Sequence, residues 1–369
     1  MMKTYYWKLQ ENGNNREIFS QAAALIKKGE VVAFPTETVY GLGADGLNGT
    51  AVAKIFAAKG RPADNPLILH IAEKKDIEVL AEEINANAKL LMEKFWPGPL
   101  TLVVRKSARI PDEVSAGLAT VAVRMPSNKW ANEFIRACGC PVAAPSANIS
   151  GRPSPTNGRD VLEDMDGKIA AVLDGGGSGI GIESTVVDTT EPVPVILRPG
   201  GITYEMLLDV LGAVDIDPAL HGDKNFRPKA PGMKYRHYAP KAPMYLFTED
   251  AVCALPYIVD EALKAGMKPG ILCSSGIAEQ LDCGNEAVLA SWGDGSASLA
   301  AKLFYLLRDF DRGNADVIFA QGVEEEGLGL AVMNRMRKAA GNQVVVLENG
   351  ALRLKNNAQL PEFMIKYRA

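Results

Sequence analysis

The stretch PTETVYGLGADGLNGTAVAKIFAAKGRPADNPL, residues 35–67, says more about the fold than any other part of the chain. It follows an apolar run at 31–34 that is typical of a buried strand, and its first proline ends that strand. A glycine-rich turn leads to a predicted helix at 50–58, and Lys59 and Arg61 come directly after this helix. A strand, a helix and two cations within so few residues predict an α/β unit that handles anions.

The same alternation of short apolar runs and helical patterns continues through the first two-thirds of the chain. Strands are predicted at 67–71, 100–105, 120–124, 169–173, 184–187 and 193–197, and helices at 76–94, 127–137 and 203–211. Strands mixed with helices predict an open α/β sheet that helices cover. A second β-α rhythm near the C-terminus predicts a smaller, Rossmann-like α/β domain.

The length of 369 residues exceeds the size at which one hydrophobic core usually stops growing, so at least two domains are expected. We expect a first domain at 1–215, a proline-rich linker at 216–243, the smaller domain at 244–345 and an extension of unknown role at 346–369. The linker is long for a segment without periodicity, and such segments are usually functional or disordered.

The composition is that of an ordinary globular protein, with 47% hydrophobic and 23% charged residues. A net charge of −4 argues against a surface that wraps nucleic acid, so any RNA contact should be local or transient. Five cysteines without paired spacing indicate reduced thiols, and neither a disulfide framework nor a zinc site. No apolar stretch approaches the length of a membrane span, and we expect a cytoplasmic protein.

Several common motifs are absent. The chain has no GxxxxGK[ST], HExxH or GxSxG, which argues against P-loop, zinc-protease and nucleophile-elbow chemistry. The glycine run at 174–181 looks like a dinucleotide-binding loop only superficially, because it leads into a strand-like segment and not into a helix.

Cations and small polar groups at the ends of predicted elements are the remaining signal. We expect four of the cations to converge on one edge of the sheet: Lys59, Arg61, Arg124 and Arg198. Ser146, Asn148 and Ser154 lie in a Pro/Gly-rich loop that can hold a phosphate, although turn chemistry alone would also explain them. Phosphoryl or nucleotidyl transfer depends mostly on positioning and charge stabilisation, so it needs groups of this kind.

Two further features are ambiguous by themselves. His70 ends an apolar run, where a histidine is more often structural than catalytic. The tract KYRHY at 234–238 mixes cations and aromatics, which suits either base stacking or the anchoring of a linker.

Seven blocks, in this order, resemble the YrdC-like family: PTETVYGLG, KGRPADNPL, WPGPLT, TVAVRMP, APSANISGRPSPT, ESTVVD and ILRPG. The block APGMKYRHYAP and the second domain resemble the longer, Sua-type members of that family, the threonylcarbamoyl-AMP synthases. The match extends from about residue 20 to about residue 340. The resemblance implies a YrdC-like open, twisted, mixed sheet with helices, followed by the smaller Rossmann-like domain.

The resemblance also implies an activity. It implies a nucleotidyltransferase that makes threonylcarbamoyl-AMP and pyrophosphate from L-threonine, bicarbonate and ATP, with Mg²⁺ accompanying the ATP. The product serves tRNA processing, as the precursor of threonylcarbamoyladenosine next to the anticodon. The implied partners are therefore the proteins that transfer the threonylcarbamoyl group to tRNA, with at most weak direct contact to tRNA. No membrane partner is implied, and no protein residue is assigned to the metal.

Individual residues take roles from the same resemblance. The implied threonine-binding set is Thr36, Thr38, His70, Arg124, Ala144 and Ser184. The implied ATP- and AMP-binding set is Lys59, Arg61, Asn65, Thr120, Ser146, Asn148, Ser154, Arg198 and Tyr235. Arg124 is the natural partner of the amino-acid carboxylate. Tyr235 lies in the linker, which would then fold over the mouth of the active site as a lid.

Two other functions are compatible with parts of the sequence. One is an RNA-binding module that uses a basic concave sheet face. The other is a carbamoyl-adenylate-handling domain of the hydrogenase-maturation type, since those proteins share the YrdC-like core. The chain lacks their zinc-finger-like cysteines, which argues against the second alternative.

Overall fold

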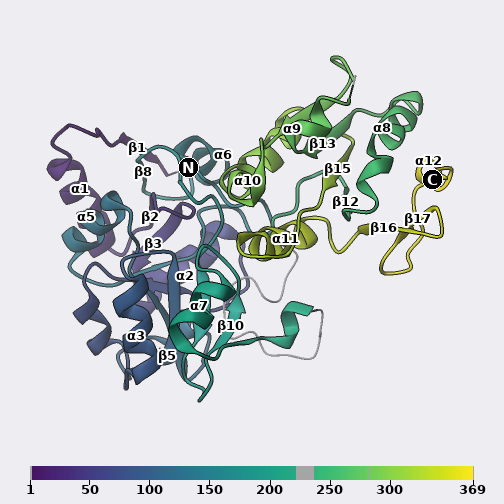
Figure 1. Ribbon diagram of the computed structural model, residues 1–369. Coiled ribbons are helices and arrows are strands. Elements are labelled where there is room, and N and C mark those ends of the chain that lie inside the picture. The colour runs from purple at the N-terminus through teal and green to yellow at the C-terminus, as the bar shows by residue number, and fades with distance from the viewer. Residues whose placement is uncertain (1, 222–236, 282, 369) are drawn as a thin grey trace. The chain divides into compact units, whose positions relative to one another are not determined.

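The computed structural model describes residues 2–221, 237–281 and 283–368. The chain forms two compact units, of which unit 1 comprises 1–150 and 154–235 and unit 2 comprises 151–153 and 236–369. Each unit is a β-sheet with helices packed on its faces (Figure 1). The predicted fold class, an open mixed α/β sheet followed by a smaller α/β domain, is confirmed.

Unit 1 is built on a sheet of eleven strands within the described part of the chain, in the order β1-β8-β2-β3-β7-β4-β6-β5-β9-β10-β11. The strands are β1 Tyr5–Lys8, β2 Val32–Phe34, β3 Gly41–Asp45, β4 Ile68–His70, β5 Leu100–Arg105, β6 Thr120–Arg124, β7 Val142–Ala144, β8 Ala171–Asp174, β9 Thr185–Asp188, β10 Val195–Arg198 and β11 Asp215–Ile216. Its helices are α1 Arg16–Lys27, α2 Gly49–Lys59, α3 Ala86–Phe95, α4 Asp112–Ser115, α5 Lys129–Cys138, α6 Gly158–Met165 and α7 Tyr204–Leu211, with 3-10 turns η1 Lys74–Val79 and η2 Pro218–His221.

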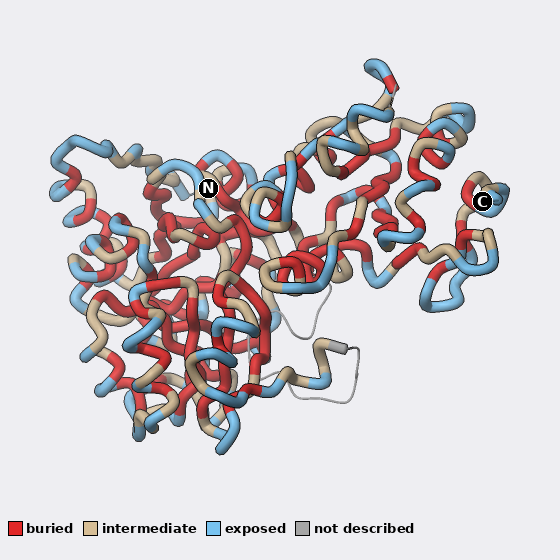
Figure 2. Tube along the Cα trace, viewed as in Figure 1, coloured by how far each residue is buried: buried red, intermediate tan, exposed pale blue. Residues whose placement is uncertain are grey.

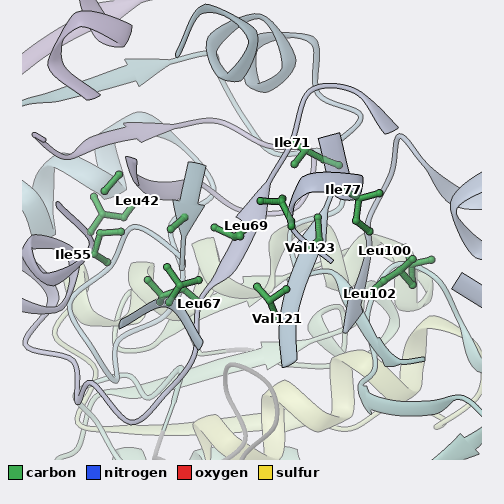
Figure 3. Close-up of a cluster of buried hydrophobic side chains, with 14 of the residues drawn as sticks. Leu42, Ile55, Leu67, Leu69, Ile71, Ile77, Leu100, Leu102, Val121 and Val123 are labelled. Carbon is green, nitrogen blue, oxygen red and sulfur yellow. The ribbon is translucent and has the colours of Figure 1, made fainter. Parts of the chain in front are cut away.

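One face of this sheet carries the main hydrophobic core. Side chains from α2, α3, α4, α6 and α7 pack there against alternate strand residues, including Leu69, Leu102 and Val123 (Figure 3). The continuous red segments of Figure 2 show that these strands are buried along most of their length. Because strand side chains alternate between faces, the residues between these core positions point to the opposite face.

The opposite face is divided into two parts. Helices α1 and α5 cover the part formed by β2, β7 and β8. The buried side chains of α5 recur every three or four residues, as in an amphipathic helix, and the Asn128 side chain caps its first turn by accepting from the amides of Trp130 and Ala131. Over β4, β5, β6, β9 and β10, the described residues form only a small apolar cluster. We call this second part the open face.

Two details of unit 1 differ from the sequence prediction. The helix predicted at 76–94 is two elements, η1 and α3, because Asn85 caps a new helix by accepting from the amide of Ala88 at 2.9 Å. Strands β1, β3, β7 and β11 were not predicted. Strand β3 is glycine-rich, and a Cβ on Gly43 would lie 2.9 Å from the Phe34 ring and 2.7 Å from Val142, so close packing explains the glycine.

Unit 2 contains six strands among the described residues, in the order β14-β13-β15-β12-β16-β17. They are β12 Met244–Phe247, β13 Pro269–Cys273, β14 Val288–Ser291, β15 Val317–Gln321, β16 Val344–Glu348 and β17 Ala351–Leu354. Its helices are α8 Leu255–Lys264, α9 Ser275–Ala278, α10 Gly295–Arg312, α11 Leu328–Ala339 and α12 Glu362–Ile365, with the 3-10 turn η3 Val252–Ala254. All pairings are parallel except that of the edge strand β17 with β16.

Two features of unit 2 bear on the predicted boundaries. The boundary predicted between 345 and 346 falls inside β16, so the C-terminal segment supplies strands to this sheet. Residues 151–153, which the sequence places in the first domain, belong to unit 2. There the buried Arg308 donates from Nη2 to the carbonyl oxygen of Pro153 at 2.7 Å.

The position of Leu102 in the main core predicts its contribution to stability. Leu102 is fully buried, whereas Leu208 on α7 is 38% exposed. We expect Leu102→Ala to lower the free energy of unfolding by about 2–5 kcal/mol, because it removes buried methyl groups and leaves a cavity. The matched Leu208→Ala should change it by less than about 0.5 kcal/mol. Urea unfolding followed by tryptophan fluorescence checks both values, and equal midpoints would contradict this core assignment.

Candidate active site

Four of five adjacent strands bring polar side chains into one row on the open face. In the strand register, His70 on β4 lies opposite Arg124 on β6, and Arg124 lies opposite Thr101 on β5. Thr101 pairs in turn with Val186 on β9, which pairs with Arg198 on β10. Neighbouring strands lie about 4.8 Å apart, so consecutive members of the row are within reach of one bound molecule. We call His70, Arg124, Thr101 and Arg198 the polar row.

Arg198 joins the polar row because of a β-bulge. The register between β9 and β10 shifts between Ile196 and Arg198. In a regular strand, Arg198 would face the same side as Ile196, because the two residues are two positions apart. Ile196 belongs to the main core, so Arg198 would then point into that core and away from the open face. The extra residue turns Arg198 to the open face, opposite Val186.

Arg124 is buried and is held from three sides. Its Nη1 donates to Thr38 Oγ1 at 2.9 Å, and its Nε donates to the carbonyl oxygen of Gly98 at 3.4 Å. Its Nη2 lies 2.8 Å from Glu37 Oε1 as an ion pair. Thr36 supports this arrangement, since its Oγ1 lies 2.8 Å from Thr38 Oγ1. The turn Thr36-Glu37-Thr38, which we call the TET turn, therefore fixes the direction of the guanidinium.

His70 is a neutral group beside Arg124. It is 4% exposed, its Nδ1 lies 3.2 Å from the carbonyl oxygen of Ile68, and its ring meets the Phe34 ring edge-on at 5.8 Å. Burial lowers the pKa of His70 to about 3, and the nearby positive charge of Arg124 acts in the same direction. At neutral pH the ring is therefore uncharged and offers one donor and one acceptor.

The other end of the polar row is a chain of hydrogen bonds. Thr101 Oγ1 lies 2.8 Å from Ser184 Oγ, and Arg198 Nη2 donates to the same Ser184 Oγ at 3.1 Å. Arg198 Nε also donates to the Ser184 carbonyl oxygen at 3.0 Å. All three residues are at least 95% buried. The arrangement places a cation and two hydroxyls together, where they can stabilise negative charge.

A second polar group lies at the opposite end of these strands, around the loop after β7. Lys59 at the end of α2 is 2% exposed, and its Nζ donates to the carbonyl oxygens of Ser146 at 2.5 Å and Asn148 at 2.6 Å. Ser146 Oγ donates to Asn148 Oδ1 at 2.5 Å. Lys59 thus holds the serine-asparagine loop in place. We call Lys59, Arg61, Asn65, Ser146 and Asn148 the loop group.

Arg61 and Asn65 complete the loop group just before β4. Arg61 Nη2 donates to the carbonyl oxygens of Asn65 and Pro66, each at 3.3 Å. The Asn65 side chain is 1% exposed, and neither of its polar atoms makes a hydrogen bond with a described residue. Buried amides are rarely left without partners, so this side chain is suited to contact a ligand.

The expected single edge of four cations is therefore wrong. Strand register places Arg124 and Arg198 at the carboxyl ends of β6 and β10, whereas Lys59 and Arg61 lie near the start of β4. The physical reason is that α2 returns the chain to the beginning of β4. His70 pairs with Val142 on β7, and Ser146 of the loop group lies four residues after Val142, or roughly 13 Å along the extended chain.

An apolar strip separates the two groups. Ile68 pairs with Ala122 on one side and with Ala144 on the other, and Ala122 pairs with Val103. These residues are all buried. Thr120, at the start of β6, shares the face of Ala122 and Arg124 beyond this strip. An extended ligand that contacts both polar groups would cross the apolar strip.

The remaining predicted residues, Ala144, Ser154 and Tyr235, belong to neither the polar row nor the loop group. Ala144 ends β7 and packs with α1 and α5. Ser154 is fully buried and donates to Glu183 Oε1 at 2.6 Å. Tyr235 and most of the predicted lid lie outside the described residues.

The structure also brings in residues that the sequence did not assign. Thr101 belongs to the polar row, Glu37 forms an ion pair with Arg124 of that row, and Ser154 donates to Glu183. All three lie within the quoted sequence blocks, but one carboxylate between two threonines and one threonine at a strand start carry no distinctive pattern. Only the pairing of distant strands shows their role.

The described residues offer neither a metal-binding cluster nor a membrane-spanning helix. No group of three or more His, Cys, Asp or Glu side chains is arranged there to hold a metal ion. None of the helices described is both long and apolar enough to span a bilayer.

Two family models match consecutive parts of the chain. One described as telomere recombination, of the Sua5, YciO and YrdC group, matches residues 24–200. One described as the threonylcarbamoyl-AMP synthase C-terminal domain matches residues 202–341. Together the two models match most of both units.

Similar proteins match over nearly their whole length. The threonylcarbamoyl-AMP synthase of Pyrococcus abyssi is 50% identical over 327 residues, which are 88% of this chain and 94% of that protein. That of Bacillus subtilis is 46% identical over 354 residues, which are 93% of this chain and 100% of that protein. The crystal structure of P. abyssi Sua5 complexed with L-threonine matches with a TM-score of 0.88 and 47% identity, covering 94% of this chain and all of that chain.

The neutral state of His70 predicts a pH dependence of stability. The ordinary pKa of histidine is about 6.5, so below that pH the unfolded chain takes up a proton at this position while the folded protein does not. Stability is therefore lost as the pH falls from 6.5 towards 3. His70→Gln removes this loss, and between pH 6.5 and pH 5 the wild type should lose on the order of 2 kcal/mol more than the variant. Urea unfolding at several pH values checks this, and parallel profiles would contradict it.

Proposed function

The chain belongs to the threonylcarbamoyl-AMP synthase family, and on that premise we propose that it joins L-threonine, bicarbonate and ATP into threonylcarbamoyl-AMP and pyrophosphate. The observation that carries this proposal is the pair of polar groups on one sheet face with an apolar strip between them. The product has the same division, with an amino-acid carboxylate at one end and a nucleotide at the other. Roughly 13 Å between the two groups suits a molecule of that length.

We assign the amino acid to the Arg124 end of the polar row. Arg124 is the partner of its carboxylate, because a buried guanidinium binds a carboxylate through two parallel hydrogen bonds. Thr38 and Glu37 already hold this guanidinium in place. The neutral ring of His70, the end of β7 at Ala144 and the hydroxyls of Thr36 and Ser184 complete the proposed threonine subsite.

We assign the nucleotide to the loop group and to Arg198. Arg61 and Asn65 are proposed phosphate contacts, and Lys59 positions the loop that carries Ser146 and Asn148. The other proposed contacts are Thr120, Ser154 and Tyr235. Mg²⁺ is proposed to arrive as part of Mg-ATP, because this ion retains several waters and is usually held by substrate phosphates.

The chemistry requires charge stabilisation more than acid-base groups. The amino group of threonine condenses with bicarbonate to a carbamate, which releases water and a proton, and a carbamate oxygen then attacks the α-phosphorus while pyrophosphate leaves. Negative charge grows on the α-phosphoryl oxygens and on pyrophosphate. Arg61 and Arg198 are the cations proposed to meet that charge, since preorganised donors stabilise a transition state without reorganising.

The wider setting is proposed from the same premise. The adenylate would pass to proteins that transfer the threonylcarbamoyl group to tRNA, in the cytoplasm and without strong direct tRNA binding. We propose that 1–215 is the catalytic domain and that the linker at 216–243 covers its site.

The activity is tested by pyrophosphate release. With ATP, bicarbonate and Mg²⁺, the purified protein should release pyrophosphate only when L-threonine is added. Arg61→Ala should lower turnover by about 10²-fold, because it removes one cation from the developing charge. Arg109→Ala is the matched control, since Arg109 is exposed. Release that does not depend on threonine would contradict the proposal, and salt-sensitive RNA binding without turnover would favour the RNA-binding alternative.

The role of Mg²⁺ as a companion of ATP makes a separate prediction. Excess EDTA should abolish pyrophosphate release, and added Mg²⁺ should restore it. The same EDTA should leave the melting temperature of the ligand-free protein unchanged, because no cluster of metal ligands is present among the described residues. Differential scanning calorimetry measures this. A melting temperature that falls with EDTA would indicate a resident structural metal instead.

A further inference from the structure

Glu37 lies beside Arg124 of the polar row, and only one of its two carboxylate oxygens has partners among the described residues. Its Oε1 accepts from the backbone amide of Ser127 at 3.1 Å and lies 2.8 Å from Arg124 Nη2. Its Oε2 is buried and makes no hydrogen bond with any described residue. The side chain as a whole is 13% exposed.

Glu37 carries a negative charge at neutral pH. Burial alone would raise the pKa of this carboxyl, but the positive charge of Arg124 and the Ser127 amide hold it below its ordinary value. Glu37 is therefore ionised at neutral pH, and Oε2 has lone pairs but no donor. A buried oxygen of this kind costs stability unless a donor reaches it, so it is suited to a ligand that brings one.

An α-amino acid bound through its carboxylate at Arg124 has an ammonium group close enough to donate to Glu37 Oε2. Its ammonium and its carboxylate are attached to the same carbon, so a receptor for both needs a cation and an anion side by side. Arg124 and Glu37 form such a pair, with 2.8 Å between Nη2 and Oε1. A site closed from water strengthens both contacts, because the local dielectric is low.

We propose that Glu37 Oε2 receives the amino group of the amino-acid substrate, so that Arg124 and Glu37 together recognise both charges of the zwitterion. The inference rests on the proposed function, which seats the amino acid at Arg124. After carboxylation the nitrogen still carries one hydrogen, so the same contact holds the carbamate nitrogen while its oxygen faces the nucleotide. Glu37 thereby determines specificity for an amine-bearing acid and orients the nitrogen.

The orientation of Arg124 does not depend on Glu37 alone. Thr38 Oγ1 and the Gly98 carbonyl oxygen also accept from the guanidinium. Glu37→Gln keeps the shape of the side chain and its amide oxygen can still accept from Ser127. The variant therefore removes the negative charge while two of the three supports of Arg124 remain.

The test compares two acids that differ only in the amine. Calorimetry on the full chain measures the dissociation constants of L-threonine and of (R)-3-hydroxybutanoate, which has the same carboxylate and hydroxyl but no amino group. The wild type should prefer threonine, and Glu37→Gln should reduce that preference by roughly 10- to 100-fold through weaker threonine binding alone. The matched control is Glu30→Gln, which removes a carboxylate paired with Lys54 at 2.8 Å and should leave the preference unchanged.

Two results would overturn the inference. If Glu37→Gln weakens both acids equally, Glu37 only positions Arg124. If the preference for threonine is unchanged, the amine lies elsewhere. A failure of the proposed function looks different, since the wild type would then bind neither acid and release no threonine-dependent pyrophosphate.

Discussion

The register of five adjacent strands is the constraint on which the site depends. β4, β6, β5, β9 and β10 are paired so that His70, Arg124, Thr101 and Arg198 fall into one row. A slip by one residue would turn each of these side chains into the hydrophobic core on the other face. The fully packed core of that face opposes such a slip, so the same burial that stabilises unit 1 also aligns its polar groups.

The buried charge of Arg124 imposes a second condition. A guanidinium that is 3% exposed is costly unless it is paired, and removing one partner of a buried pair usually destabilises a protein more than the pair itself stabilises it. Thr38, Gly98 and Glu37 supply partners from two separate loops. The TET turn therefore holds Arg124 in place in the folded protein even without substrate. The same residues thus contribute both to the stability of the fold and to the proposed binding of the amino acid.

The sequence predicted the fold class and most core strands, because buried strands such as β2 and β8 lie in continuous apolar runs. It also predicted Arg124, Arg198 and Lys59 as cations at element ends. It could not predict the row, because pairs such as Thr101 with Val186 join residues far apart in the chain. The bulge that redirects Arg198, the short glycine-rich strand β3 and the role of Glu37 all depend on that pairing, and none has a periodic signature.

The central claim is that the amino acid lies at Arg124 and the nucleotide phosphates lie at the loop group, on one face of the sheet and across the apolar strip. A crystal structure of the protein with L-threonine and a non-hydrolysable ATP analogue tests it most directly. The account predicts the threonine carboxylate on Arg124 and the phosphates beside Arg61 and Asn65. Threonine bound away from β4, β6 and β5, or phosphates bound at Arg124, would contradict it.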